Sequence, residues 1–214
     1  MPAADHAAAP RIVAIHASPR RAGNTSTLLD QAVAGARAAG AQVTEVVLRQ
    51  LKISPCLEIY GCKKDGRCVI KDDFQGVCDL MLDSQGLMLA SPIFFFALSA
   101  HAKLLMDRCQ SLWVKKYWID KQPFGGGVKT RQGLFISVGA TKGPRLFEGA
   151  LLSVKYFFDV LDMELAQSLL YRGLDFEGDV LAHPAYLDEA RQAGANLAVK
   201  LAANLDTNPA ATLL

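Results

Sequence analysis

Residues 11–27 have the sequence RIVAIHASPRRAGNTST, and this stretch decides the fold. Its first part, residues 11–17, contains the apolar run of residues 12–15 and has apolar side chains on both faces, which is typical of a central strand in a parallel sheet. A polar turn follows, and then residues 25–39 carry apolar side chains at helical spacing. A buried strand, a tight turn and a helix N-terminus together favour anion binding, because the first N–H groups of a helix lack partners and the helix dipole adds positive charge.

The composition of this turn indicates that the anion is a phosphate. Hydroxyls, an amide and two arginines are concentrated here, Gly23 lets the backbone turn, and no acidic residue occurs between Asp5 and Asp30. The alternative is an ordinary helix cap, which needs only one such residue and often has an acid in the first turn. We therefore predict a phosphate loop at residues 18–27. Its candidate ligands are Ser18, Arg20, Gly23, Asn24, Thr25 and Ser26.

Strands and helices are predicted to alternate five times along the chain. The predicted strands are residues 11–17, 42–48, 86–91, 134–138 and 164–171, and the predicted helices are residues 25–39, 73–83, 99–118, 145–161 and 184–204. This alternation predicts an α/β fold with a doubly wound, five-stranded parallel sheet in the order 2-1-3-4-5, which places a ligand where the first and third strands end. We expect one domain at residues 11–205, between a disordered lead-in (1–10) and a disordered tail (206–214).

Two more loops are predicted to reach the same edge of the sheet. Residues 91–99, SPIFFFALS, hold three consecutive phenylalanines that cannot all face a core. At least one should lie over a flat ligand or in a subunit contact, unless they plug the end of the sheet. Residues 137–143, SVGATKG, form a small polar loop, so the three loops together suit a mononucleotide with a flat ring. The candidate ligands in these two loops are Ser91, Pro92, Ile93, Phe94, Phe95, Phe96, Ser137, Gly139, Ala140 and Thr141.

Several other classes of protein are disfavoured. The P-loop, dinucleotide-binding and serine-hydrolase motifs G-x-x-x-x-G-K-[ST], G-x-G-x-x-G and G-x-S-x-G are absent from the sequence. The four histidines show no metal-site spacing, and His16 is expected to be a hydrogen-bonded core residue. The net charge of +2 gives no indication of a nucleic-acid partner. Residues 1–10 do not resemble a signal peptide, and the uncharged run 84–100 is short for a membrane span, so we expect a cytoplasmic protein.

Three motifs in combination resemble a known family. They are SPRxxGNTS, a cysteine-bearing loop ending in GxCVIKDD, and SPIFFF followed by AxxKxxMDR. Together they resemble the flavodoxin-like NAD(P)H-dependent FMN reductases, in the branch that includes the iron–sulfur flavoproteins. The resemblance implies non-covalent FMN, NAD(P)H as co-substrate, and a homodimer or homotetramer with the flavin near a subunit interface. It assigns the phosphate to residues 18–26, the isoalloxazine to residues 92–96 and its edge to residues 137–141, whereas Lys103, Asp107 and Arg108 are expected to be structural or interfacial.

The activity implied is hydride transfer from NAD(P)H through FMN to a small acceptor, such as a quinone, a flavin or a metal ion. The flavin carries this chemistry, so no residue is named as catalytic. Two alternatives stay open at this point. One is an electron carrier fed by a ferredoxin-like partner, and the other is a non-enzymatic redox sensor that uses its thiols.

The cysteines depart from the pattern of the iron–sulfur flavoproteins. That pattern, C-x2-C-x2-C-x5-C, would require cysteines at positions 56, 59, 62 and 68, but position 59 is Ile59. With only Cys56, Cys62 and Cys68 in the loop, a four-thiolate cluster lacks one ligand, and we expect no iron–sulfur cluster. A three-iron cluster and a fourth ligand from elsewhere are the alternatives. Cys78 and Cys109 fall within predicted helices and are expected to be small core residues.

Overall fold

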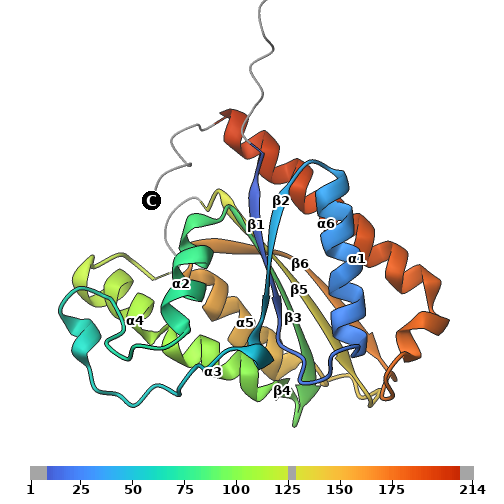
Figure 1. Ribbon diagram of the computed structural model, residues 1–214, viewed down its shortest axis with the longest axis horizontal. Helices are drawn as coiled ribbons and strands as arrows, with labels where there is room; N and C mark the ends of the chain where they lie inside the picture. Colours follow the sequence, from blue (N-terminus) through green and yellow to red (C-terminus); the bar gives the residue numbers. More distant parts are fainter. Residues whose placement is uncertain (1–8, 125–128, 208–214) are drawn as a thin grey trace, which may run out of the picture.

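A computed structural model describes residues 9–124 and 129–207 of the chain. Five parallel strands form its central sheet in the order β2-β1-β3-β5-β6 (Figure 1). These strands are β1 (Arg11–His16), β2 (Gln42–Val47), β3 (Gly86–Phe94), β5 (Arg131–Gly139) and β6 (Met163–Arg172). Counted along the chain, this is the predicted order 2-1-3-4-5, so the flavodoxin-like fold class is confirmed. Residues 1–8 and 208–214, which fall in the predicted disordered ends, and residues 125–128 lie outside the described residues.

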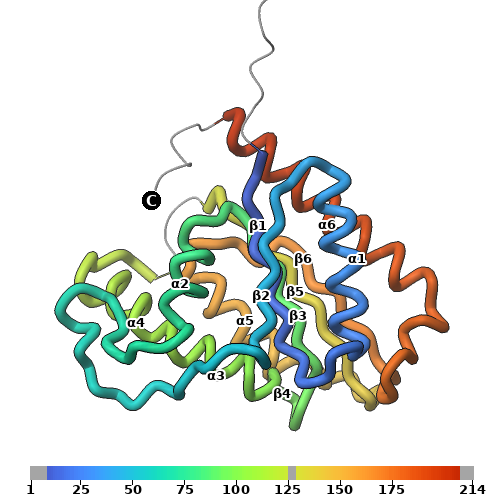
Figure 2. The backbone as a smooth tube through the Cα atoms, viewed as in Figure 1, coloured from blue at the N-terminus to red at the C-terminus, as the bar shows by residue number. Residues whose placement is uncertain are grey.

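Helices cover both faces of the sheet (Figures 1 and 2). On one face lie α1 (Asn24–Ala38) and α6 (Pro184–Thr207); on the other lie α2 (Phe74–Asp83), α3 (Ala100–Arg108), α4 (Gln110–Trp113) and α5 (Glu148–Val160). Alternate residues of β1 enter the two cores, with Ile12 and Ala14 under α1 and α6 and with Val13 and Ile15 on the opposite side. Burial on both faces explains why residues 12–15 of β1 form a continuous apolar run. Shorter segments are 3-10 turns at Leu48–Gln50, Gly61–Lys63 and Asp179–Ala182 and a π-helical turn at Val114–Ile119.

The two helices on the α1 face touch through their backbones. A Cβ atom added to Gly35 of α1 would lie 1.9 Å from the carbonyl oxygen of Arg191, and one added to Gly194 of α6 would lie 1.9 Å from the carbonyl oxygen of Ala32. Real Cβ atoms do not approach other atoms so closely, so both positions require glycine at this crossing. The position of α1 is therefore tied to that of α6.

The third strand is longer than predicted. The predicted strand ends at Ser91, before Pro92, but β3 continues to Phe94 and turns back into β4 (Ala97–Leu98), which pairs with it antiparallel. The ladder between β1 and β3 ends at the pair His16–Ala90, so β3 has lost its β1 neighbour by Pro92. Proline is tolerated at such an edge because no ladder hydrogen bond is needed there.

The helix predicted at residues 99–118 is interrupted. It begins where expected, since Ser99 caps α3 by accepting a hydrogen bond from the N–H of Ala102 (3.3 Å). It breaks at Cys109, whose N–H is shared between the carbonyl oxygens of Leu105 and Met106 (3.2 and 3.0 Å). No glycine or proline marks this break in the sequence. Among the described residues, no helix is both long enough and apolar enough to cross a membrane.

Candidate functional site

A cleft lies at the carboxyl ends of the strands, where four loops meet. The loops follow β1, β3, β5 and β6, and they surround a volume of about 500 Å³ that includes the open mouth. The residues that line the cleft are Ser18, Pro19, Arg20, Gly23, Asn24, Thr25, Pro92, Ile93, Phe94, Val138, Gly139, Ala140, Leu174 and Asp175.

The start of α1 presents free backbone donors. Gly23 precedes the helix in an extended conformation, no side chain caps the helix, and its first turn holds no acidic residue. The N–H groups of Ser26 and Thr27 both donate to the carbonyl oxygen of Gly23 (2.8 and 3.1 Å). Among the described residues, the N–H groups of Asn24 and Thr25 find no acceptor. Two free donors at the positive end of the helix dipole favour an anion at this place.

The hydroxyl groups of the loop after β1 also favour an anion at the start of α1. The Oγ of Ser26 is buried and has no hydrogen-bond partner in the described part of the chain, which is a costly state, by about 1–3 kcal/mol, for a polar group. Ser18 is also buried, and its Oγ accepts a hydrogen bond from the N–H of Arg20 (3.1 Å). Thr27 instead donates back into its own helix, to the oxygen of Gly23 (3.4 Å). The orphaned hydroxyl of Ser26 and the free N–H groups fit a phosphate.

Two predicted phosphate ligands also hold the fourth loop. Asn24 Nδ2 donates to the carbonyl oxygen of Phe176 (2.9 Å), and its Oδ1 accepts from the N–H of Val180 (3.2 Å). Arg20 Nη1 donates to the carbonyl oxygen of Asp175 (2.8 Å). The side-chain amide of Asn24 is therefore engaged, which leaves its backbone N–H for a ligand.

This fourth loop, residues 174–180, is not among the predicted parts of the site. Its signal in the sequence is DFEGD at residues 175–179. Asp179 Oδ2 accepts hydrogen bonds from the N–H groups of Asp175 and Phe176 (2.9 and 2.8 Å), and Gly178 has a φ of +88°. An aspartate that bonds to nearby backbone beside a left-handed glycine is a turn signature, but the contact with α1 depends on the tertiary fold.

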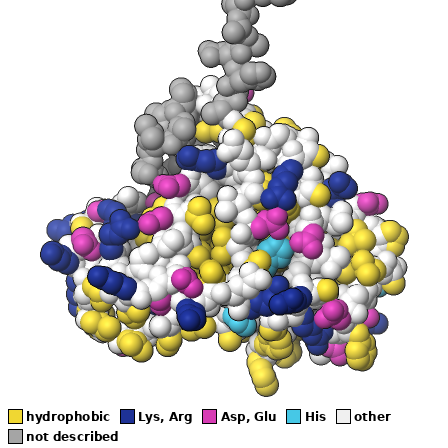
Figure 3. All heavy atoms as spheres, in the orientation of Figure 1, with side chains coloured by type: hydrophobic (Ala, Val, Ile, Leu, Met, Phe, Trp, Pro, Cys, Tyr) yellow, Lys and Arg dark blue, Asp and Glu magenta, His cyan; other side chains and the backbone are white. Residues whose placement is uncertain are grey.

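The three phenylalanines form the tip of the β3–β4 hairpin. Phe95 and Phe96 have φ values of +49° and +60°, a conformation that two-residue hairpin turns usually assign to asparagine and glycine. The side chains of Phe94, Phe95 and Phe96 are 48%, 102% and 54% exposed. Figure 3 shows hydrophobic side chains projecting from the molecule where Figure 1 has this hairpin. Exposed aromatic residues held in an unfavourable conformation indicate a function for the tip.

The serines behind the cleft hold the strand ends together. Ser137 Oγ donates to the carbonyl oxygen of Ser91 (2.7 Å), the Oγ of Ser91 accepts from the N–H of Ser99 (3.0 Å), and Ser99 Oγ donates to the carbonyl oxygen of Ala17 (2.6 Å). All three serines are buried, so they position the loops around the cleft. Thr141 is exposed and lies outside the lining.

Six of the predicted site residues do not line the cleft directly. They are Ser91, Ser137 and Thr141, described above, and Ser26, Phe95 and Phe96.

The loop cysteines lie apart from this lining. Cys56, Cys62 and Cys68 are all half-buried, and burial raises the pKa of Cys62. Ile59 is 59% exposed and offers no metal ligand, so this loop supplies three thiols. Such a donor set is one short of a four-thiolate cluster, and the absence of a cluster stays a prediction.

Arg108 anchors the cysteine loop to α3. Its guanidinium is fully buried and donates to Asp72 Oδ2 (2.6 Å), Cys68 Sγ (3.3 Å) and the carbonyl oxygens of Ser54 (3.0 Å) and Ile70 (3.1 Å). These contacts make Arg108 a structural residue. Cys78 and Cys109 are buried core residues, and burial raises the pKa of Cys78 to about 12.

Comparison with known proteins identifies the family. The sequence profile of NADPH-dependent FMN reductases matches residues 10–168. The chain belongs to this family. An iron–sulfur flavoprotein of Methanocaldococcus jannaschii is 30% identical over 132 residues, which are 62% of this chain and 63% of that protein. YwqN of Bacillus subtilis, which is named as an NAD(P)H-dependent FMN-containing oxidoreductase, is 26% identical over 173 residues. These residues are 80% of this chain and 89% of that protein.

The match to the first relatives is partial. The chain spans 63%, 54% and 44% of the lengths of the M. jannaschii protein and of two iron–sulfur flavoproteins of Archaeoglobus fulgidus. Among solved structures, an NAD(P)H:quinone oxidoreductase from Methanothermobacter marburgensis superposes with a TM-score of 0.67 at 18% identity, covering 89% of this chain and 96% of that one. A flavone reductase superposes with a TM-score of 0.66 at 19% identity, covering 89% and 62%. At identities of 18% and 19%, these solved structures show only that the chain shares their fold.

Proposed function

We propose that this chain binds FMN in the cleft and is an oxidoreductase that uses NAD(P)H. The observation that carries the proposal is the first turn of α1, at the positive end of the helix dipole, where two N–H groups and the hydroxyl of Ser26 have no partner among the residues that the structure describes. Membership of the FMN reductase family supports FMN as the phosphate-bearing ligand. Bound FMN would supply hydride acceptance from a nicotinamide and electron donation to an acceptor.

The role of the chain's own residues is to bind and position the cofactor. Ser18, Ser26 and the N–H groups at the start of α1 would hold the phosphate, with Arg20 supplying a charge. Residues 92–96 would lie along the ring, and residues 137–141 would contact its edge. No protein acid or base lies among the proposed contacts of the ring, so the chain contributes position rather than proton transfer. A quinone, a free flavin or a metal ion is the proposed acceptor.

We also propose that the exposed hairpin tip, residues 94–96, lies in the interface of a homodimer or homotetramer. Three exposed phenylalanines next to the cleft support this role, because monomers rarely leave such a cluster in water. Light scattering should show an oligomer, and replacing Phe95 by serine should shift it towards the monomer. An unchanged oligomer in that variant would contradict an interface at the tip.

The visible absorption spectrum tests the main proposal. The purified protein should show the two bands of a flavin, and anaerobic NADPH should bleach them. A yellow protein that NADPH does not bleach would favour an electron carrier that depends on a protein partner. The iron–sulfur flavoproteins among the relatives and the three loop thiols are the observations that favour this second function. A protein that binds no FMN would refute both.

A further inference from the structure

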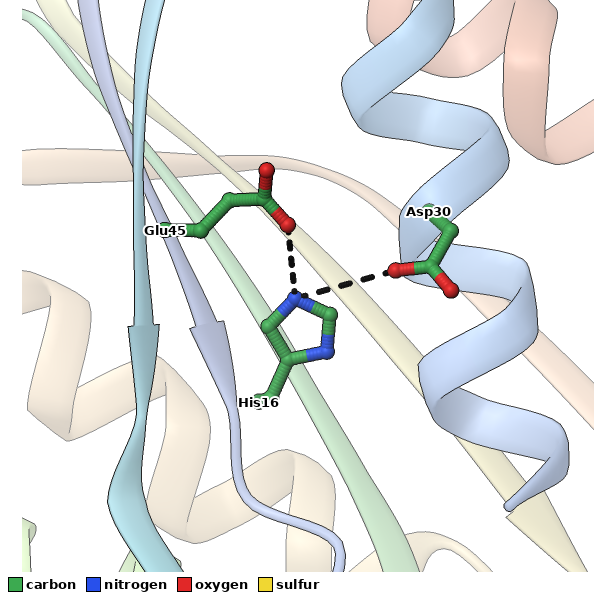
Figure 4. Close-up of side chains that lie close together, drawn as sticks. All are labelled: His16, Asp30 and Glu45. Atoms are coloured by element: carbon green, nitrogen blue, oxygen red, sulfur yellow. Dashed lines mark hydrogen bonds and ion pairs between the residues drawn. The ribbon is translucent and has the colours of Figure 1, made fainter. Parts of the chain in front are cut away.

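Three potential metal ligands converge on the α1 face of the sheet, away from the lining of the cleft. His16 ends β1, Glu45 lies on β2 and Asp30 lies on α1, and their side chains point toward one another (Figure 4). The Nε2 of His16 lies 3.3 Å from Glu45 Oε2 and 3.9 Å from Asp30 Oδ1, and all three ligand atoms lie within 4.8 Å of one another. We propose that these residues bind a divalent transition-metal ion such as Zn²⁺. The proposal does not depend on the FMN site.

The spacing of the three atoms suits a small coordination sphere. Nitrogen and carboxylate oxygen ligands lie about 2.0–2.2 Å from Zn²⁺, so two ligands of a tetrahedral ion are roughly 3.4 Å apart. The distances of 3.3 and 3.9 Å from His16 are close to this value. The side chain of Asp30 is 61% exposed and can close the remaining difference by a small rotation.

The hydrogen bonds of the cluster leave the exposed carboxylate of Asp30 without a donor from the described part of the chain. A single Nε2 faces two carboxylates, and its one hydrogen can serve only the nearer, Glu45. Asp30 accepts no hydrogen bond from any residue that the structure describes, although it faces a histidine whose side chain is only 7% exposed. A cation between them would take the lone pair of neutral His16 and compensate both carboxylates.

The surroundings hold the ligands in place. Arg37 Nη2 binds Oε1 of Glu45 at 2.9 Å, which leaves Oε2 directed at His16. A hydrogen-bonded outer oxygen is usual for carboxylates that bind metals. Glu45 is 34% exposed and Asp30 is largely exposed, so the site opens to solvent on one side. Water can enter there and complete the coordination.

The ligand set selects the class of ion. An imidazole nitrogen with two carboxylates suits Zn²⁺ and neighbouring transition metals, whereas Mg²⁺ and Ca²⁺ prefer oxygen ligands alone. An ion at this position would join β1, β2 and α1, and α1 begins with the phosphate loop. The expected role is therefore to fix α1 against the edge of the sheet. The sequence gives no sign of such a site because the three ligands come from three separate elements.

Zinc titration of the full-length protein, freed of any histidine tag and treated with a chelator, tests the proposal. Because thiols also bind zinc, the titration is made in a variant with Cys56, Cys62 and Cys68 changed to serine. This variant should bind one Zn²⁺ in competition with a chromophoric chelator. The substitutions His16→Gln and Asp30→Asn, each added to it, should weaken binding at least tenfold.

Matched controls separate ligation from general effects of charge. His101→Gln and Asp79→Asn change a histidine and an exposed aspartate elsewhere in the fold, and zinc affinity should be unchanged. Zn²⁺ should also raise the thermal unfolding midpoint of the serine variant and of both controls but not of the Asp30→Asn form, whose metal-free midpoint shows whether it folds. No zinc binding in the serine variant, or equal binding by His16→Gln, Asp30→Asn and the controls, would overturn the proposal.

Discussion

Replacing Ser26 by alanine should have opposite effects on the ligand-free protein and on FMN binding. In the ligand-free protein the buried Oγ of Ser26 has no partner among the described residues, so it lowers stability by its desolvation cost. Removing it should leave the free energy of unfolding in urea unchanged or raise it by up to about 1–3 kcal/mol. Most substitutions of buried residues lower stability, so this direction is diagnostic.

The same substitution should weaken FMN binding. A hydrogen bond to a charged acceptor such as a phosphate contributes about 1.5–3 kcal/mol. Since about 1.4 kcal/mol corresponds to a tenfold change in affinity, the dissociation constant should rise roughly 10- to 150-fold. Quenching of flavin fluorescence during titration of FMN with ligand-free protein measures it. Thr27→Val is the matched control, because the hydroxyl of Thr27 already donates to Gly23 and its loss should leave FMN affinity near that of the wild type.

Two results would refute this reasoning. If Ser26→Ala binds FMN as tightly as the wild type, its hydroxyl does not contact the phosphate. If the ligand-free variant loses more than about 1 kcal/mol of stability, then the hydroxyl has a partner in the free protein after all.

Three further predictions concern the anchor of the cysteine loop and the cleft. Arg108→Met should lower the free energy of unfolding in urea by about 3–5 kcal/mol, because it leaves Asp72 buried without its partner. Arg67→Met, which breaks an exposed ion pair, should lower it by less than about 1 kcal/mol. Similar losses in the two variants would contradict the role of Arg108 as an anchor. Burial raises the pKa of Asp72, but hydrogen bonds from Arg108 and from two backbone N–H groups bring it below its ordinary 3.8. A carboxyl group with a lowered pKa in the folded state stabilises the protein at pH values above its pKa in the unfolded chain. The wild type should therefore exceed Asp72→Asn in stability by the full amount above about pH 5, and the difference should shrink as the pH falls below about 4. A stability difference that stays constant from about pH 7 to about pH 3 would count against this role of Asp72. Arg20→Ala should weaken FMN binding by about 1.5–3 kcal/mol in the same fluorescence titration, and unchanged affinity would exclude Arg20 as a phosphate ligand.

The fold was predictable because its signals are local and agree with one another. The apolar run at residues 12–15, the helical spacing after it and Gly40 beyond the first helix each predict what is found. Gly40 has the left-handed φ of +90° expected of a helix stop. The end of β3 was predicted too early, at Pro92, because a proline is tolerated inside a strand only where a neighbouring strand is missing. That information is in the sheet and not in the local sequence.

The site was predictable where a loop carries its own signals, as the loops after β1, β3 and β5 do. The composition of residues 18–26 indicates an anion site. In the structure, the N–H groups of Asn24 and Thr25 at this place have no acceptor among the described residues. The loop at 174–180 was missed because its link to Asn24 joins residues more than 150 positions apart. The group of His16, Asp30 and Glu45 was missed because its members come from β1, α1 and β2 and meet only in the folded chain, and His16 alone was expected to be a core residue.

The crossing of α1 and α6 has a consequence at the other end of α1. A methyl group at Gly35 or Gly194 would force the two helix axes apart, since it would overlap a carbonyl oxygen. A helix is a stiff rod, and the eleven steps along the helix from Gly35 back to Asn24 span about 16 Å. Separation at the crossing would therefore tilt the first turn of α1 relative to the strands. Affinity for an anion could thus be tuned from three turns away, by residues that never touch it.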